Sequence, residues 1–397
     1  MSILTPLAIP NFRLFWAGMS VSTMGFWMQN ITAAWLMKVW SDGDPVLVSL
    51  VQTAMFLPSM FLSLPAGLAS DRANRQSLLI FAHTLMMATP LVIAALIAVQ
   101  LESPILLLLM TACLAAGNAL KLPAQSALLP DLVAKDQLPA AIGLNSLAVN
   151  GGRVLGPALS AGLLPVMGPA TLLVLNALTY FSFIVILLRL KLGAKVLVVR
   201  APTRLWDDVL ELLRFTRRTA AFATVLRRSG LYFAAWAIVL AVLPLMVEDA
   251  SQFGMIYANF GIGSIVGALV MDWVRGRLGE DATLNIAILG HAVLIAVLSL
   301  VHSLAAMSAC LFGIGAMSFY AMSSLQIAAQ QGLPRELRGR GIALMTMVIM
   351  GASALSSPVW GSLARAFDVT TALQAAAAFS IVSLAVTFRQ KIGAQNL

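Results

Sequence analysis

Four ionisable side chains lie inside long apolar stretches of the sequence, where a charge is costly. They are His83, Lys121, Arg153 and His291. An ionisable group at membrane depth is expensive to bury and marks a functional position by default. Arg153 lies about 20 Å along its stretch from the inner end, too deep for its side chain to reach the membrane surface. We therefore expect Arg153 to face a cavity or to bind backbone carbonyls.

The other ionisable groups have different expected roles. His83 and His291 are each expected to be a hydrogen-bonded packing residue or a proton carrier near neutral pH. Lys121 lies near the inner end of its stretch, where we expect its amine to reach back to the membrane surface. Proton linkage, if the protein uses it, would fall to a histidine or to the acidic pair Glu248 and Asp249 at an outer helix end.

Acidic side chains do not lie deep within any of the apolar stretches. A hydrophobic cation needs such a carboxylate, because an opposite charge in a low dielectric compensates for the hydration that the ligand loses. We therefore expect neutral or anionic substrates, such as phenolate or carboxylate compounds, with Arg153 as an anchor. No side chains show the spacing of a catalytic or metal site, so we expect no enzyme, no metal and no cofactor.

The composition identifies the elements that must position these groups. Hydrophobic residues make up 60% of the 397 residues and charged residues only 10%, whereas a soluble domain has about 25% charged residues. Twelve apolar stretches of roughly 20 residues predict twelve transmembrane segments. Backbone amides in hydrocarbon must be satisfied internally, so the segments are helices and we predict an all-α membrane protein. The predicted segments are residues 14–37, 46–69, 77–99, 104–128, 139–164, 169–190, 229–247, 251–273, 283–301, 304–329, 342–364 and 370–388.

The basic residues predict the orientation of these helices. Of the 25 lysines and arginines, 21 fall in alternate loops on the same side as the N-terminus, and only Lys38 and Arg365 fall in the opposite loops. The positive-inside rule then places both termini in the cytoplasm of a multi-pass protein of the bacterial inner membrane. The net charge of +9 therefore indicates acidic phospholipids as partners and not nucleic acid. We expect a monomer.

One long polar interruption divides the segments six and six. It predicts an N-terminal half (1–190), a cytoplasmic linker with an amphipathic helix (191–228) and a C-terminal half (229–397). Similar loops also recur six helices apart, after Asp71 and after Asp272. This spacing predicts two parallel six-helix halves, an arrangement of secondary transporters.

The loop between segments 2 and 3 combines a carboxylate with two guanidinium groups. Such groups at a helix junction can pair with one another or with helix ends, and those contacts can break when two halves rock. The sequence resembles the loop signature of the major facilitator superfamily, although Asn74 and Gln76 depart from it. The resemblance implies a lock between two access states. The matching residues are Gly67, Asp71, Arg72 and Arg75.

Segment 5 carries small residues at spacings that let another helix approach closely, together with a proline that kinks it. The pattern of Gly143, Gly152, Gly156 and Pro157 resembles the antiporter motif of drug and proton exporters in the same superfamily. Arg153 lies within this motif. The motif indicates export by family association.

The wider sequence is similar to the branch of the superfamily that contains the enterobactin exporter, in the runs 24–29 and 333–340 among others. The resemblance implies the major facilitator fold, with segments 1, 4, 7 and 10 around a central substrate cavity. Aromatic faces with a few amides suit an amphipathic organic molecule. Candidate lining residues are Trp27, Gln29, Asn30, Asn118, Arg153, Trp236, Phe319, Tyr320 and Gln326.

Together these observations predict a secondary exporter of a small organic compound that works by alternating access. The expected substrate is siderophore-like, drug-like or another amphipathic metabolite. An importer and a lipid-translocating permease of the same fold remain alternatives. A channel is disfavoured because the sequence contains no ring of charges or carbonyl filter.

Overall fold

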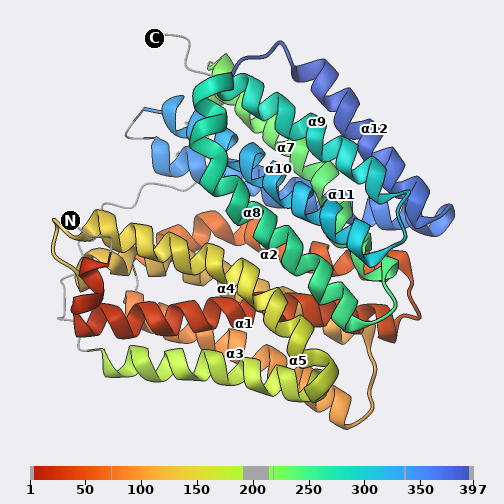
Figure 1. Cartoon of the computed structure of the whole chain (residues 1–397). Coiled ribbons are helices and arrows are strands. Elements are labelled where there is room, and N and C mark those ends of the chain that lie inside the picture. Colours follow the sequence, from red (N-terminus) through yellow and green to blue (C-terminus); the bar gives the residue numbers. More distant parts are fainter. Residues whose placement is uncertain (1–3, 73, 191–213, 218, 335–336, 393–397) are drawn as a thin grey trace. The chain divides into compact units, whose positions relative to one another are not determined.

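The computed structural model describes residues 4–72, 74–190, 214–217, 219–334 and 337–392. Every regular element in these residues is a helix (Figure 1). Two short 3-10 helices, Thr5–Ala8 and Leu243–Met246, accompany the long ones. The long helices are α1 Pro10–Trp40, α2 Pro45–Arg72, α3 Arg75–Ala98, α4 Pro104–Leu132, α5 Leu138–Arg189, α7 Ala220–Val242, α8 Ala250–Leu278, α9 Glu280–Leu298, α10 Leu304–Gln331, α11 Arg338–Ala366 and α12 Val369–Thr387.

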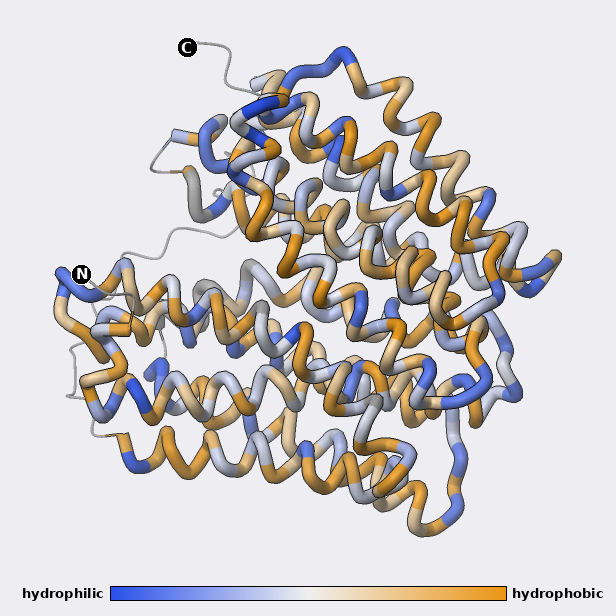
Figure 2. The backbone as a smooth tube through the Cα atoms, viewed as in Figure 1, coloured by the Kyte–Doolittle hydropathy of each residue, from blue (hydrophilic) through white to orange (hydrophobic). Residues whose placement is uncertain are grey.

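Ten helical spans in the described residues are long and apolar enough to cross a membrane. Figure 2 shows hydrophobic residues along the lengths of these helices and hydrophilic residues at many of their connections. The chain is therefore a multi-pass membrane protein. Helix α1 and the part of α5 before Gly162 are not among the ten spans. In α1 the reason is a series of buried polar side chains that lower its hydropathy, namely Ser22, Thr23, Gln29, Asn30 and Thr32.

Helix α5 contains two of the predicted segments without an intervening loop. Its backbone leaves the helical region at Gly168, where φ is 73° and ψ is 163°. Glycine adopts a positive φ without a steric penalty, and Pro169, which follows, cannot donate a backbone hydrogen bond. The break expected between residues 164 and 169 is thus a sharp kink.

Helix α7 begins at Ala220, so the expected start at residue 229 is wrong. The sequence prediction started the helix too late because Arg227 and Arg228 are charged. Arg228 is nevertheless only 1% exposed, and its guanidinium donates to Asn285 of α9 and to the backbone oxygen of Gln390, which follows α12. The amphipathic helix predicted near 205–215 lies almost entirely outside the described residues.

Two compact units make up the chain. The N-terminal unit contains Met1–Gly43, Phe61–Val199 and Glu248–Ala258, and the C-terminal unit contains Asp44–Met60, Arg200–Val247 and Asn259–Leu397. Each unit therefore takes most of its helices from one predicted half of the chain. The N-terminal unit also contains the first turns of α8, and the C-terminal unit also contains the first turns of α2.

Each unit has its own apolar core. In the N-terminal unit, α1, α3, α4 and α5 pack around buried residues such as Phe15, Leu79 and Phe183. In the C-terminal unit, α7, α9, α10 and α11 pack around residues such as Phe222 and Leu325. These cores hold the helices that carry the deep polar side chains.

Candidate functional site

The loop after α2 joins three helices of the N-terminal unit. Arg75 donates to the Asp131 carboxylate and to the Ala127 backbone oxygen of α4, each at 3.0 Å. Asn74 caps α3 by accepting from the Ser77 amide at 3.1 Å. Gln76, which stands where the superfamily signature has a cation, donates to the backbone oxygen of Leu187 near the end of α5 at 2.5 Å. The loop thus fixes neighbouring ends of these helices to one another.

The remaining residues of this loop signature, Gly67, Asp71 and Arg72, lie in α2. Their side chains are outside the described part of the structure, so the expected lock between access states stays a prediction. A related arrangement occurs in the C-terminal unit. There Arg275 of α8 pairs with Glu280 of α9 at 2.8 Å and donates to Ser323 of α10 at 3.1 Å.

The small residues of α5 bring its backbone close to α1. A Cβ atom added at Gly156 would lie 2.7 Å from both the Met24 backbone oxygen and the Trp27 Cβ, and one added at Gly152 would lie 2.7 Å from the Thr23 side chain. Such distances are too short for any larger residue. Pro157 follows within the helix, and Gly143 lies near its start. The spacing of the motif therefore serves the contact between α5 and α1.

Arg153 lies on this contact. Its guanidinium carbon is 5.1 Å from the centre of the half-buried Trp27 ring. Tyr257, from the α8 turns that belong to the N-terminal unit, is within electrostatic range of the guanidinium. The Arg153 Nε atom is buried and has no hydrogen-bond partner among the described residues. The guanidinium therefore has a stacking partner, while the hydrogen-bonding capacity of Nε is unused.

Lys121 is 3% exposed and lies in α4. The expectation that it reaches the membrane surface is wrong, because α4 continues to Leu132, which places Lys121 about 16 Å from that helix end. Its Nζ atom lies 5.9 Å from the centre of the Phe26 ring. Phe26 in turn contacts Trp27 edge-on, with ring centres 5.6 Å apart and planes at 85°.

The amides that the sequence placed in the cavity are mostly buried. Gln29 donates to Thr89 of α3 at 3.1 Å and accepts from Asn176 of α5 at 2.7 Å. Each of the three residues is 1% exposed. Asn30 is 3% exposed, and Asn118 is half-buried. The Gln29 amide thus ties α1 to α3 and α5. Sequence reasoning did not identify Thr89 or Asn176, because one amide or hydroxyl in an apolar segment gives no sign of its direction.

The candidate lining residues of the C-terminal unit also differ in environment. Trp236 is half-buried, donates to Ser318 of α10 at 3.1 Å, and contacts the Phe56, Phe233 and Phe260 rings. Tyr320 is 8% exposed, Phe319 is half-buried and Gln326 is exposed. Ser318 also accepts from Tyr232 at 3.3 Å. An aromatic cluster with a shared hydroxyl therefore lies around Trp236.

The two deep histidines have opposite hydrogen-bonding environments. His83 is fully buried, with Nδ1 2.8 Å from the Leu79 backbone oxygen and Nε2 3.1 Å from the Ser22 hydroxyl. Nδ1 donates to the carbonyl, and in the neutral ring Nε2 accepts from the Ser22 hydroxyl. His291 is also fully buried, but neither of its ring nitrogens has a partner among the described residues. Of the two, His291 has the free nitrogen that a proton carrier requires.

The acidic pair before α8 has a structural role. Asp249 accepts from the Gln252 amide at 2.8 Å, while the Gln252 side chain accepts from the Glu248 amide at 3.2 Å. These contacts cap the helix reciprocally. Lys38, at the end of α1 and in the same unit, is within electrostatic range of both acids. A role of the pair in proton coupling stays a prediction.

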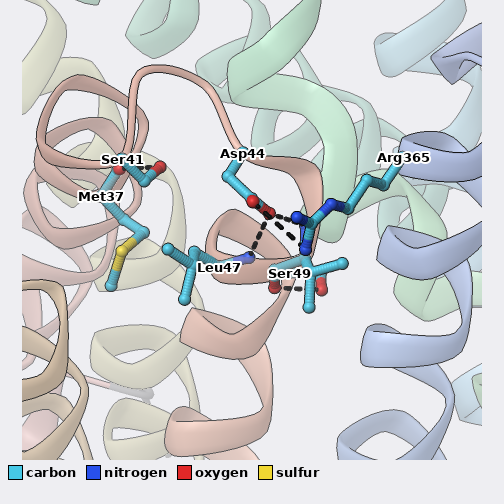
Figure 3. Close-up of polar contacts among 7 residues, drawn as sticks. Met37, Ser41, Asp44, Leu47, Ser49 and Arg365 are labelled. Atoms are coloured by element: carbon cyan, nitrogen blue, oxygen red, sulfur yellow. Dashed lines mark hydrogen bonds and ion pairs between the residues drawn. The ribbon is translucent and has the colours of Figure 1, made fainter.

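The first turns of α2 are held by α11 within the C-terminal unit. Asp44 caps α2 by accepting from the Val46 and Leu47 amides, and its carboxylate lies 3.5 Å from the Arg365 guanidinium (Figure 3). One further contact joins Thr53 to the Ala354 backbone oxygen at 2.8 Å. Both loops had been placed on the outer side by the distribution of cations, and the ion pair is consistent with that shared side.

Comparison with known proteins identifies the chain's relatives. The model of a family described as transmembrane secretion effectors, within the major facilitator superfamily, matches residues 1–396. A staphyloferrin A transporter of Staphylococcus aureus is 23% identical over 347 residues, which are 84% of this chain and 85% of that protein. An uncharacterised transporter of the superfamily from Bacillus subtilis, YfiS, is 26% identical over 280 residues, 69% of this chain and 62% of its own.

Solved structures share the fold. A mutant of the nucleoside transporter NupG has a TM-score of 0.80 at 14% identity, covering 95% of this chain and 98% of its own. A POT family transporter in complex with 5-aminolevulinic acid has a TM-score of 0.79 at 11% identity, covering 96% of both chains. The xylose transporter XylE from E. coli, in an inward-open conformation, has a TM-score of 0.71 at 12% identity, covering 94% and 96%.

Proposed function

Because the chain belongs to the transmembrane secretion effector family of the major facilitator superfamily, we propose that it is a secondary transporter that exports a small organic anion. The family consists of transporters, so the chain is a membrane transporter and not an enzyme. In this proposal twelve helices form two six-helix halves in the bacterial inner membrane, with both termini in the cytoplasm. The halves alternate access to a substrate held near the middle of the bilayer.

One observation carries the proposed substrate charge. The Arg153 guanidinium stacks on Trp27 at membrane depth while its Nε lacks a partner among the described residues. A deep cation without a carboxylate is costly, and an anionic ligand would supply the missing charge and hydrogen-bond acceptors. Trp27 would contact the apolar or conjugated part of the same ligand. Phenolate and carboxylate compounds fit both features.

Neighbouring contacts support alternating access. The first turns of α2 and α8 each belong to the unit formed mainly by the other half of the chain. Arg75 fixes the inner ends of α3 and α4, while Asp71 and Arg72 would provide the lock between access states. Within the C-terminal unit, Asp44 and Arg365 are joined by one partly exposed ion pair. An exposed pair of this kind contributes little free energy, so the contact is readily broken.

The direction of transport depends on the coupled gradient, because the same fold can import or export. Export is supported by the family description as secretion effectors and by the small-residue motif of α5. The relative that transports staphyloferrin A supports a siderophore-like substrate. Import and lipid translocation are the alternative functions of this fold.

Efflux of dyes of opposite charge tests the proposal. Cells that express the wild type should export an anionic dye faster than a cationic dye of similar size. Arg153→Gln should lower anion efflux by about tenfold, corresponding to one strong charged contact, and Arg153→Lys should retain part of it. Arg13→Gln, on the exposed start of α1, is the matched control and should transport normally.

Two results would contradict the proposal. Robust efflux of the cationic dye, or undiminished anion efflux by Arg153→Gln, would remove the role of Arg153 as a substrate anchor. Net accumulation of the anionic dye inside cells that express the wild type would instead indicate an importer.

A further inference from the structure

Lys121 is buried without a counter-charge. It is 3% exposed, and none of the ion pairs among the described residues includes its amine. A lysine at this depth cannot be explained as a surface anchor, because its helix continues for nearly three more turns. A buried charge without a partner would be replaced by an apolar residue at a gain in stability unless it served a ligand. Lys121 therefore needs a functional explanation.

The structure connects Lys121 to Arg153 through two consecutive aromatic rings of α1. The Lys121 Nζ lies 5.9 Å from the centre of Phe26, Phe26 contacts Trp27 edge-on at 5.6 Å, and the Arg153 guanidinium carbon lies 5.1 Å from the centre of Trp27. Each ring attracts the cation next to it, which offsets part of the cost of burial. Two neighbouring rings of α1 thus contact one cation from α4 and one cation from α5.

No anionic group among the described side chains balances these two cations. His83 lies within electrostatic range of Lys121, but an imidazole supplies no negative charge in either of its ordinary protonation states. The Tyr257 phenol lies within electrostatic range of Arg153. The described acids of the N-terminal unit lie in loops or in the last or first turn of a helix, as Asp131 and Asp249 do. The two charges therefore need an external partner.

We propose that Lys121 and Arg153 together form a binding site for a substrate with at least two anionic groups, one at each cation, whose connecting part lies along Phe26 and Trp27. This inference rests on the proposed export of an organic anion and adds a requirement for a second charge. Each carboxylate of such a substrate gains a charge-assisted hydrogen bond in a low dielectric. A monoanion would satisfy Arg153 and leave Lys121 unpaired, so the site discriminates by charge number.

A pair of dyes with the same ring system tests the second charge. At mildly acidic pH the xanthene phenol of both dyes is protonated, so fluorescein carries one negative charge, on its carboxylate, and carboxyfluorescein carries two. Binding of each dye to the purified full-length protein in detergent is measured at this pH by fluorescence polarisation. The wild type should bind carboxyfluorescein about tenfold more tightly than fluorescein, the size of one charged contact. Lys121→Gln should abolish this preference with little change in fluorescein binding, and Lys121→Arg should preserve it.

The outcomes separate this inference from the proposed function. Suppose that Lys121→Gln keeps the preference for carboxyfluorescein while Arg153→Gln weakens the binding of both dyes. The two-cation site is then wrong, and the proposed anion exporter is unaffected. If Arg153→Gln binds both dyes as the wild type does, the anchor in the proposed function fails as well.

A stability measurement gives an independent test of Lys121. Because its charge is unbalanced in the ligand-free protein, Lys121→Met should unfold at the same temperature as the wild type or at a higher one. A lower unfolding temperature for Lys121→Met would show that the amine is paired inside the helix bundle, which would overturn the proposed site.

Discussion

Polar side chains deep in the N-terminal unit fall into two groups that differ in their partners. The first group is Gln29, Thr89 and Asn176, whose amides and hydroxyl satisfy one another between α1, α3 and α5. The second group is the pair of cations, Lys121 and Arg153, which contact aromatic rings and form no ion pair with a described acid; the Arg153 Nε also lacks a hydrogen-bond partner among the described residues. A satisfied network specifies and stabilises one packing of the helices. Groups that lack partners are the ones left to recognise a ligand.

Removing one member of the satisfied group should destabilise the protein. Asn176→Ala leaves the Gln29 oxygen buried without its donor, which should lower the free energy of unfolding by about 1–3 kcal/mol. The midpoint of thermal unfolding in detergent, followed by tryptophan fluorescence, measures the effect. Gln326→Ala, at an exposed amide, is the control and should unfold like the wild type. Equal midpoints for the two variants would contradict a stabilising network.

At this scale the sequence identified charges better than amides. Arg153 was recognisable because a charge in an apolar stretch stands out, and its depth followed from the rise of a helix. Lys121 was misinterpreted because the predicted segment ended at 128, whereas α4 continues to Leu132. His83 and His291 look alike in the sequence, and they differ in their contacts: the His83 ring contacts Leu79 of its own helix and Ser22 of α1, whereas neither His291 ring nitrogen has a partner among the described residues. Such distinctions depend on tertiary contacts.

Among the elements, α1 and α5 have the most restrictive contact. Gly152 and Gly156 lie against the α1 backbone, and the same contact places Trp27 beside Arg153. The small residues therefore position the candidate site as well as the helices. The sequence predicted a close approach from the spacing of these glycines. It could not show which helix approaches, because the partner is far away in the chain.

The glycines of α5 offer a matched pair of substitutions. A Cβ at Gly156 would lie 2.7 Å from the α1 backbone, whereas a Cβ at Gly151, in the same helix, meets nothing within 4 Å. Gly156→Ala should therefore lower both the unfolding temperature and anion efflux, with a loss of stability of about 1–3 kcal/mol from overpacking. Gly151→Ala should be neutral or slightly stabilising, since alanine favours a helix over glycine. Similar efflux and stability in both variants would contradict the restrictive contact.

For the whole molecule, composition predicted the class of protein and periodic apolar stretches predicted most of the helices. Ten spans in the described part of the chain are long and apolar enough to cross a membrane, and the predicted break near Gly168 is a kink in α5. The assignment of the first turns of α2 and α8 to the other unit had no signal in the sequence. It depends on long-range contacts such as that between Asp44 and Arg365, whereas hydropathy reports only local composition.

The orientation of the molecule in the membrane can be tested by cysteine labelling. Of 25 cations, 21 lie in loops on the predicted inner side, which predicts cytoplasmic termini. Asp44 would be a poor labelling position because its carboxylate caps α2 and pairs with Arg365. Glu102 and His302 are exposed in predicted outer loops, and Lys135 is exposed in a predicted inner loop. With Cys113 and Cys310 replaced by serine, single cysteines can be placed at these three positions.

An impermeant maleimide should label Glu102→Cys and His302→Cys in intact cells, one in each half of the chain. Lys135→Cys should react only after the membrane is permeabilised, because its loop would be cytoplasmic. Labelling at both Glu102→Cys and His302→Cys is expected because parallel halves have the same orientation in the membrane. If the halves had opposite orientations, only one of the two cysteines would be labelled in intact cells. Labelling of Lys135→Cys in intact cells, with protection of the other two, would reverse the orientation and place the basic loops outside.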